Sequence, residues 1–181
     1  MSGGFALDRN GRFVLRLEPV ERMLMISLCE QIIELVAPDE ADPDADPLAA
    51  AVGIDAAAMT PEDPVLLRLF PEAYTEDPAA SSDFRRFTER DLRQTKLNHA
   101  ETVLDCLERS GEKLLIPVAL GPSWLGFMND VRLALGERIG IDDDFHEEVA
   151  DLPEDDPRLA MVGVYDWFTY LQDSLVQIML P

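Results

Sequence analysis

Residues 5–36 read FALDRNGRFVLRLEPVERMLMISLCEQIIELV, and this stretch largely decides the predicted fold. Apolar residues alternate on either side of Asn10-Gly11, a dipeptide that adopts the positive φ angles of a tight hairpin turn. Pro19 suits the first turn of a helix, and the residues from there to Val36 are apolar around most of a helical circumference. The stretch therefore predicts a short β-hairpin followed by a central, buried helix.

Apolar periodicity continues through the rest of the chain, in segments separated by Pro, Gly and Ser residues. A long helix is expected to begin at Ser81 or Ser82, with a serine cap, and to end at about Arg109. Its apolar side is expected to include Phe84 and Phe87. The other helices are expected at residues 65–70, 121–139 and 164–179, with a single helical turn at 48–54.

The predicted fold class is mainly α, with a minor β component (α+β). Residues 113–118 (KLLIPV) predict a short strand that ends near its proline and could pair with the strand at 13–17. About four main helices would then form a bundle beside a small antiparallel sheet, made of the N-terminal hairpin and this third strand. With 181 residues, 47% of them hydrophobic, a single domain over residues 1–181 is expected.

Two acidic stretches interrupt the apolar pattern, at about residues 38–47 and 141–157. Their low hydrophobicity predicts surface loops, because such segments cannot bury enough apolar area to offset the entropy of ordering. We expect the second loop to contact a partner. Its candidate partner-binding residues are Asp142, Asp143, Asp144, Glu147 and Glu148.

The formal net charge of −21 limits the classes of partner. Nucleic-acid binding depends on a positive surface, and the basic residues gather nowhere into a patch, so direct DNA or RNA binding is not expected. Anionic membranes are disfavoured for the same reason, and no apolar run approaches the roughly 20 residues of a spanning helix. The first residues lack the features of a secretion signal, so a cytoplasmic protein is expected. A compositional origin of the acidity, through solubility or coding bias, stays open.

Metal binding is not indicated. His99 has no second histidine at helical spacing, and His146 stands within the acidic loop, where a solvated loop is the simpler interpretation. Asp42, Asp44 and Asp46 begin like a calcium-binding loop, but a proline follows where that loop requires glycine. We therefore expect no metal and no cofactor.

Catalytic signatures are also missing from the sequence: no nucleophile elbow, phosphate-binding glycine loop or dinucleotide fingerprint is present. A protein without enzymatic activity is the leading hypothesis. The alternative is an enzyme or small-ligand binder with a pocket lined by Trp124, Tyr165 and Trp167.

Cys29 and Cys106 are the two cysteines, and each has a leucine beside it within a predicted helix. Buried structural thiols are the simpler interpretation. The alternative is a redox pair, which requires the two helices to pack with Cα atoms within about 7 Å.

Four stretches in order resemble the actinobacterial DUF2017 family, whose members include AosR-like oxidative stress regulators. They are residues 17–22 (LEPVER), 63–74 (DPVLLRLFPEAY), 130–136 (DVRLALG) and 165–172 (YDWFTYLQ). The resemblance spans nearly the whole chain. It implies a cytoplasmic regulator that senses oxidation through cysteines and acts together with an extracytoplasmic-function sigma factor.

The leading hypothesis is therefore a regulatory protein that binds a sigma factor or RNA polymerase through an acidic face, and that could dimerise through its last helix. A basic partner surface would be attracted to such a face. The resemblance also implies an alternative, because genes of the family lie near that of a Clp protease adaptor. That alternative is an adaptor linked to Clp-type proteolysis.

Overall fold

The computed structural model describes residues 3–37, 61–74, 76–142, 145, 149 and 152–180. Its elements in chain order are β1 (Ala6–Leu7), β2 (Phe13–Arg16), α1 (Pro19–Val36), α3 (Pro64–Leu69), α4 (Pro78–Arg109), β3 (Lys113–Ile116), the 3-10 helix η1 (Val118–Leu120), α5 (Gly121–Ile139) and α7 (Arg158–Met179). The predicted mainly helical fold with a small antiparallel sheet is confirmed. The helical turn expected at 48–54 and the acidic loop at 38–47 lie outside the described residues.

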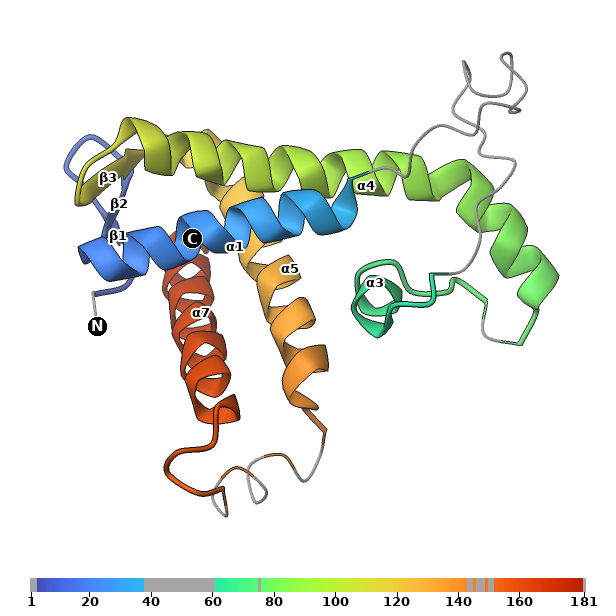
Figure 1. The fold of residues 1–181 in the computed structure, drawn as a ribbon. Helices are drawn as coiled ribbons and strands as arrows, with labels where there is room; N and C mark the ends of the chain where they lie inside the picture. Colours follow the sequence, from blue (N-terminus) through green and yellow to red (C-terminus); the bar gives the residue numbers. More distant parts are fainter. Residues whose placement is uncertain are drawn as a thin grey trace.

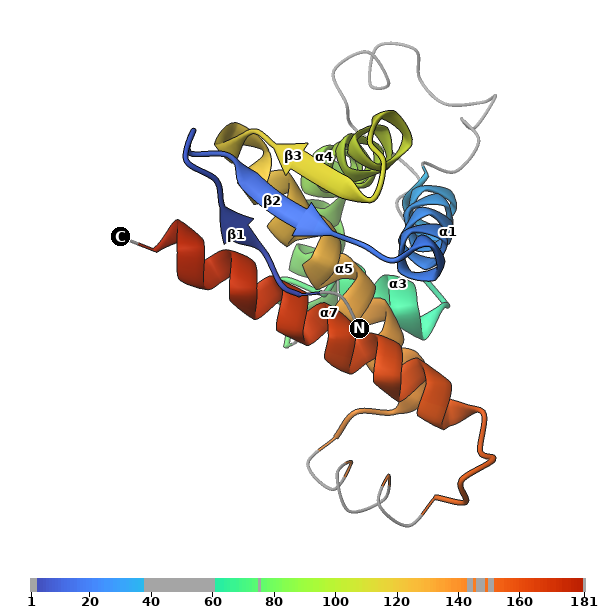
Figure 2. The same cartoon turned by 90° about the vertical axis from the view of Figure 1, so that its left-hand side faces the viewer.

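The three strands form one sheet in the order β1-β2-β3, at one end of the helices (Figure 2). Asp8 closes the predicted hairpin, since its Oδ1 accepts hydrogen bonds from the backbone N–H groups of Asn10 and Arg12, both at 2.8 Å. Gly11 has a φ of 72°, a left-handed conformation that favours glycine. β3 pairs antiparallel with β2, as predicted, and ends immediately before Pro117.

α5 is the central helix of the structure. It packs against α1, α3, α4 and α7, and it buries Trp124, Phe127 and Val131 completely. Figure 1 shows α4 and α1 side by side, with α5 and α7 descending together at a steep angle to them. Within the described ranges, no helix is both long and apolar enough to cross a membrane.

The prediction that residues 19–36 form the central, buried helix is wrong. α1 buries a single stripe, which includes Met25, Cys29 and Val36, and it presents this stripe mainly to α4. On the opposite side, Val20 is 75% exposed and Met23 is 69% exposed. Apolar composition alone does not determine how many neighbours a helix has, and α1 lies at the edge of the bundle.

Two helices begin earlier than the sequence analysis predicts. α4 starts at Pro78, because the Asp77 side chain accepts a hydrogen bond from the backbone of Ala80 at 3.0 Å and caps the first turn. The predicted serine cap is therefore wrong, and Ser81 is instead a buried residue inside the helix. α7 starts at Arg158, where Val164 was expected.

Three arginines satisfy the C-terminal ends of helices other than their own. Arg22 of α1 donates to the carbonyl oxygens of Leu107 and Ser110 at the end of α4. Arg93 and Arg85 of α4 do the same at the ends of α1 and α3. A cation is favourable there, because the last carbonyls of a helix lack partners and the helix dipole is negative at that end. These three cations contribute to the packing of the bundle.

Candidate interaction surface

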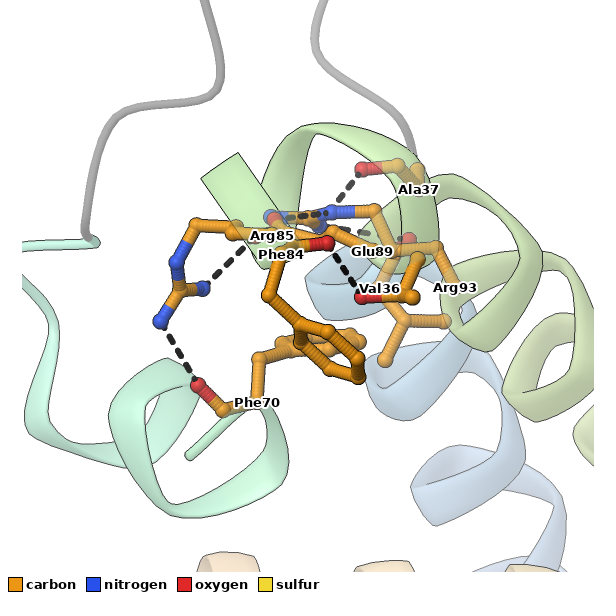
Figure 3. Close-up of polar contacts among 8 residues, drawn as sticks. Val36, Ala37, Phe70, Phe84, Arg85, Glu89 and Arg93 are labelled. Carbon is orange, nitrogen blue, oxygen red and sulfur yellow. Dashed lines mark hydrogen bonds and ion pairs between the residues drawn. The ribbon is translucent and has the colours of Figure 1, made fainter. Parts of the chain in front are cut away.

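A network of charged side chains fixes the ends of α1 and α3 against α4 (Figure 3). Arg85 donates through Nη2 to the carbonyl oxygen of Phe70 at 3.1 Å, and its Nη1 lies 2.6 Å from Oε2 of Glu89. Glu89 also binds Arg93, with Oε1 at 2.8 Å from Nε and from Nη2. Arg93 then donates to the carbonyl of Val36 at 3.4 Å. One carboxylate is thereby shared by two guanidinium groups.

The spacing of these residues explains why they meet. Arg85, Glu89 and Arg93 recur every four residues, so they share one face of α4. Their side chains are 6%, 12% and 11% exposed, so water screens the ion pairs weakly. The Arg93 guanidinium also lies 4.6 Å from the centroid of the Phe70 ring, a cation–π contact. We call Phe70, Arg85, Glu89 and Arg93 the floor network.

A small groove lies over the floor network, between the end of α3 and the first turns of α4. Its lining consists of Phe70, Pro71, Ala73, Ser81, Phe84, Arg85, Thr88, Glu89 and Leu92. The free volume is about 60 Å3, well below the roughly 300 Å3 or more of typical small-molecule sites. The groove has room for the end of one apolar side chain and not for a metabolite.

Three exposed aromatic side chains lie in the segment before α4 and in its first turns, and we call Tyr74, Phe84 and Phe87 the aromatic rim. Phe84 lines the groove and Tyr74 contacts Phe84, whereas Phe87 lies about one turn further along α4, on the side away from Arg85. Tyr74, Phe84 and Phe87 are 50%, 47% and 56% exposed, respectively. The rings of Tyr74 and Phe84 meet edge to face, with centroids 6.1 Å apart and planes at 87°. The prediction that Phe84 and Phe87 belong to the apolar packing side of the long helix is wrong, because the floor network occupies the buried side at this level.

Exposed carboxylates flank the aromatic rim. Glu72 and Glu76 lie in the connection between α3 and α4, and Asp77 and Asp83 lie at the cap and in the second turn of α4. Among these four carboxylates, the described structure shows one ion pair, a 3.6 Å contact between Asp83 and Arg86. An apolar patch with an acidic margin is typical of a surface that binds a protein with apolar and basic groups.

A second buried ion pair joins α4 to α5. Lys96 Nζ lies 2.5 Å from Oδ1 of Asp130, and Asp130 is only 2% exposed. Burial raises the pKa of the Asp130 carboxyl in spite of the nearby ammonium group. Burial also lowers the pKa of the neighbouring His99 imidazole. None of the three lines the groove, so we interpret them as a packing contact between two helices.

Comparison with known proteins places the chain in a family. The family model described as "Domain of unknown function (DUF2017)" matches residues 2–179. The chain belongs to the DUF2017 family. This confirms the resemblance seen in the sequence.

Relatives of this DUF2017 protein carry a functional name. A Mycobacterium leprae protein named AosR is 34% identical over 179 residues, which cover 91% of this chain and 81% of the relative. The oxidative stress regulator AosR of Mycobacterium tuberculosis strain H37Rv is 30% identical over 183 residues, which cover 93% of this chain and 83% of the relative. No solved structure matches the chain.

The two cysteines of this DUF2017 protein are not joined in a disulfide and lie in helices that pack together, α1 and α4. Cys29 is completely buried, and burial raises its thiol pKa far above the usual range. Burial also raises the pKa of Cys106, which is half-buried. The Trp124 indole acts in the opposite direction on Cys106, although its Nε1–H makes no hydrogen bond of ordinary geometry within the described chain, so this contact is weak. Both thiols are therefore mostly protonated at neutral pH.

The predicted partner-binding cluster is only partly described. Asp142 is exposed at the end of the segment after α5. Asp143, Asp144, Glu147 and Glu148 lie outside the described residues, as does His146. The contribution of this loop to partner binding stays a prediction.

The tryptophans proposed as pocket residues lie in the core of this DUF2017 protein. Trp124 is fully buried and meets Phe5 edge to face, with centroids 5.5 Å apart. Trp167 is 4% exposed and packs against Phe168 at 5.2 Å. Tyr165 is half-buried, and the guanidinium carbon of Arg132 lies 5.2 Å from the centroid of the Tyr165 ring. The two indole rings are therefore enclosed by the core and do not face a solvent-accessible pocket.

The wide apolar arc of the last helix is covered within the same chain. α7 packs against α5 and β1, and it buries Trp167, Phe168, Leu171 and Leu175. Its exposed positions are mostly polar or small: Arg158, Ala160, Gly163, Asp166, Tyr170, Asp173 and Gln177. A second copy is not needed to cover the apolar side of this helix.

Proposed function

We propose that this DUF2017 protein is a non-enzymatic, cytoplasmic regulator of the response to oxidative stress that acts by binding a protein through the aromatic rim. The observation that carries the proposal is the half-exposed aromatic pair of Tyr74 and Phe84 beside a groove over the buried floor network, with Phe87 also exposed on the next turn of α4. Rigid exposed aromatic residues are characteristic of binding hot spots. The names of the relatives support the regulatory part.

The proposed partner is a sigma factor or RNA polymerase. A net charge of −21 opposes direct contact with DNA, so a regulator of transcription with this surface would act through a protein that itself binds DNA. Such proteins carry basic surfaces, and opposite charge increases the rate of encounter. The acidic margin of the aromatic rim supports this choice.

A complementation experiment tests the proposal. The gene is deleted from its host, and the strain receives the wild-type gene, a Phe84→Ser/Phe87→Ser variant or a Val20→Ser/Met23→Ser control. Val20 and Met23 are more exposed than the rim residues and lie at the start of α1. After peroxide treatment, we expect the wild type and the control to restore the transcript response, and the rim variant to fail. Full restoration by the rim variant would contradict the proposed surface.

Copurification from peroxide-treated cells distinguishes the partners. Enrichment of a sigma subunit or RNA polymerase with the wild type, and its loss with the rim variant, supports the proposed partner. Enrichment of Clp subunits in its place would favour the proteolysis adaptor. The small groove is the reason to prefer either of these functions over an enzyme.

Oxidation sensing through Cys29 and Cys106 is a separate part of the proposal. The raised pKa values predict slow reaction with peroxide, because the thiolate is the reactive form. If the pair forms a disulfide, peroxide changes the mobility of the wild type on a non-reducing gel, and Cys106→Ser abolishes that change. An unchanged wild-type band would rule out sensing through a disulfide between these two residues.

A further inference from the structure

The aromatic rim also indicates what kind of protein segment it binds. Its shape, its rigidity and its charge each restrict the partner. What these features indicate about the partner rests on the proposed function, since the surface is the same.

The shape indicates a helical partner. Phe84, Thr88 and Leu92 line the groove along two turns of α4, a length of about 12 Å. Two turns of a partner helix have the same length, so apolar residues one heptad apart on that helix would meet both ends of the groove. The groove itself has room for the end of one apolar side chain, which would sit between Phe84 and the floor network.

The rigidity makes the surface favourable for binding. Arg85 is fixed by Glu89 and by the Phe70 carbonyl, so the backbone of α4 beneath Phe84 is held to the end of α3. The Phe84 ring is further fixed by its edge-to-face contact with Tyr74. Side chains that are already ordered lose little entropy on binding, and more of the contact energy then appears as affinity.

The charge indicates that the partner helix is basic. Four exposed carboxylates flank the rim: Glu72, Glu76, Asp77 and Asp83. The nearby cations are already in use, since Arg85 is paired with Glu89 and Arg86 contacts Asp83. A second copy of the chain would bring the same acidic margin and a further charge of −21, so it is electrostatically disfavoured as the occupant.

From these three features we infer that the aromatic rim binds an amphipathic helix of a partner protein, with apolar side chains on one face and lysine or arginine on both flanks. The apolar face packs on Phe84 and Phe87, and one of its side chains enters the groove. The basic flanks pair with the carboxylates of residues 72–83.

Binding to synthetic peptides tests the inference. The probes are fluorescently labelled peptides of about 15 residues, or four helical turns. The first is an amphipathic helix of Leu and Lys, the second replaces every Leu with Gln, and the third replaces every Lys with Glu. We expect the purified wild-type protein to bind the first peptide most tightly. The second measures attraction by charge alone, and the third shows whether apolar contact suffices when the charge attraction is replaced by repulsion.

Variants then locate the binding. Phe84→Ser/Phe87→Ser is expected to weaken binding of the Leu/Lys peptide roughly tenfold or more, the effect of removing hot-spot residues. Glu72→Lys/Glu76→Lys is expected to cause a smaller loss of affinity for this peptide. That loss should grow as the salt concentration is lowered, because the charges are then screened less. Val20→Ser/Met23→Ser is the matched control and should bind as the wild type does. Circular dichroism and urea unfolding establish that each variant is folded.

The outcomes separate this inference from the proposed function. Equal affinity of wild type and rim variant for the Leu/Lys peptide, or equal affinity of wild type for the Leu/Lys and Gln/Lys peptides, would overturn the inference. Tighter binding of the Leu/Glu peptide would also overturn it. If the peptides bind as expected but deletion leaves the peroxide response unchanged, the regulatory function fails while the docking surface stands.

Discussion

At the scale of single residues, the Lys96–Asp130 pair is a buried electrostatic contact that should be sensitive to substitution. Asp130 is 2% exposed, and its ammonium partner lies at 2.5 Å. Removing one member of such a pair leaves the other as a buried, unpaired charge. Lys96→Met should therefore lower the free energy of unfolding by about 3–5 kcal/mol at pH 7, measured by urea unfolding.

The pH dependence of this destabilisation tests whether the unpaired charge of Asp130 causes it. Burial holds the folded-state pKa of Asp130 above its ordinary value, and loss of Lys96 should raise it further. A carboxyl with a raised folded-state pKa favours the folded state when protonated, so stability is lost as the pH rises through that pKa. The destabilisation by Lys96→Met should therefore shrink on acidification. Equal destabilisation at pH 7 and at about pH 5 would contradict this interpretation.

Gly126 allows close packing of α5 against His99 of α4. A Cβ atom at this position would lie 2.2 Å from Nδ1 of His99, so the imidazole and the α4–α5 contact would have to shift. Gly126→Ala should cost about 1–3 kcal/mol, the usual range for overpacking. Gly163 on α7 is the matched control, because a Cβ there meets nothing within 4 Å. Gly163→Ala should stabilise by up to about 1 kcal/mol, because alanine has the higher helix propensity. Thermal unfolding of both variants would show opposite signs.

At the scale of the elements, the outer face of the sheet contains an unfavourable pairing. The register places Arg16 of β2 opposite Lys113 of β3, and like charges directly opposite each other destabilise a sheet. Lys113→Glu should raise the free energy of unfolding by roughly 0.5 kcal/mol. Lys113→Gln removes only the repulsion and should give a smaller increase. A lower urea midpoint for Lys113→Glu would show that Lys113 has a favourable partner elsewhere.

Three helix starts share a local sequence signal. Asp63-Pro64 begins α3 and Asp77-Pro78 begins α4, in each case with the aspartate as cap. Asp156 lies at the start of α7 and accepts a hydrogen bond from the backbone of Arg158 at 2.8 Å. The dipeptide Asp-Pro was therefore the usable signal for all three starts. The serines at 81 and 82 are common cap residues, but they follow a stronger signal.

The aromatic rim was not predictable from periodicity. The usual inference assumes that the apolar face of a helix is the buried one. In the first turns of α4 the relation is reversed, because Arg85 and Glu89 are covered by the end of α3 while Phe84 and Phe87 face solvent. The floor network depends on contacts between residues far apart in the chain, such as Arg93 with Val36, and a single sequence does not reveal such contacts.

At the scale of the whole molecule, net charge should govern both stability and binding. A chain with a formal charge of −21 repels itself when folded, and salt screens this repulsion. Raising NaCl from about 0.02 M to about 0.3 M shortens the Debye length from roughly 20 Å to roughly 6 Å. Because this repulsion is screened, we expect the melting temperature to rise by a few degrees. Salt also weakens exposed ion pairs such as Arg109–Asp105, but such pairs contribute little to stability.

The same change of salt should act in the opposite direction on the aromatic rim. Attraction between its acidic margin and a basic helix is screened, so the affinity for the Leu/Lys peptide should fall while the protein becomes more stable. Thermal unfolding and fluorescence anisotropy on the same samples would measure both effects. Near pH 4.2, the isoelectric point of the sequence, the rise in melting temperature should vanish. If salt instead lowered the melting temperature at neutral pH, attraction between exposed charges of opposite sign would outweigh the net repulsion, and charge repulsion would not be the dominant electrostatic effect in the fold.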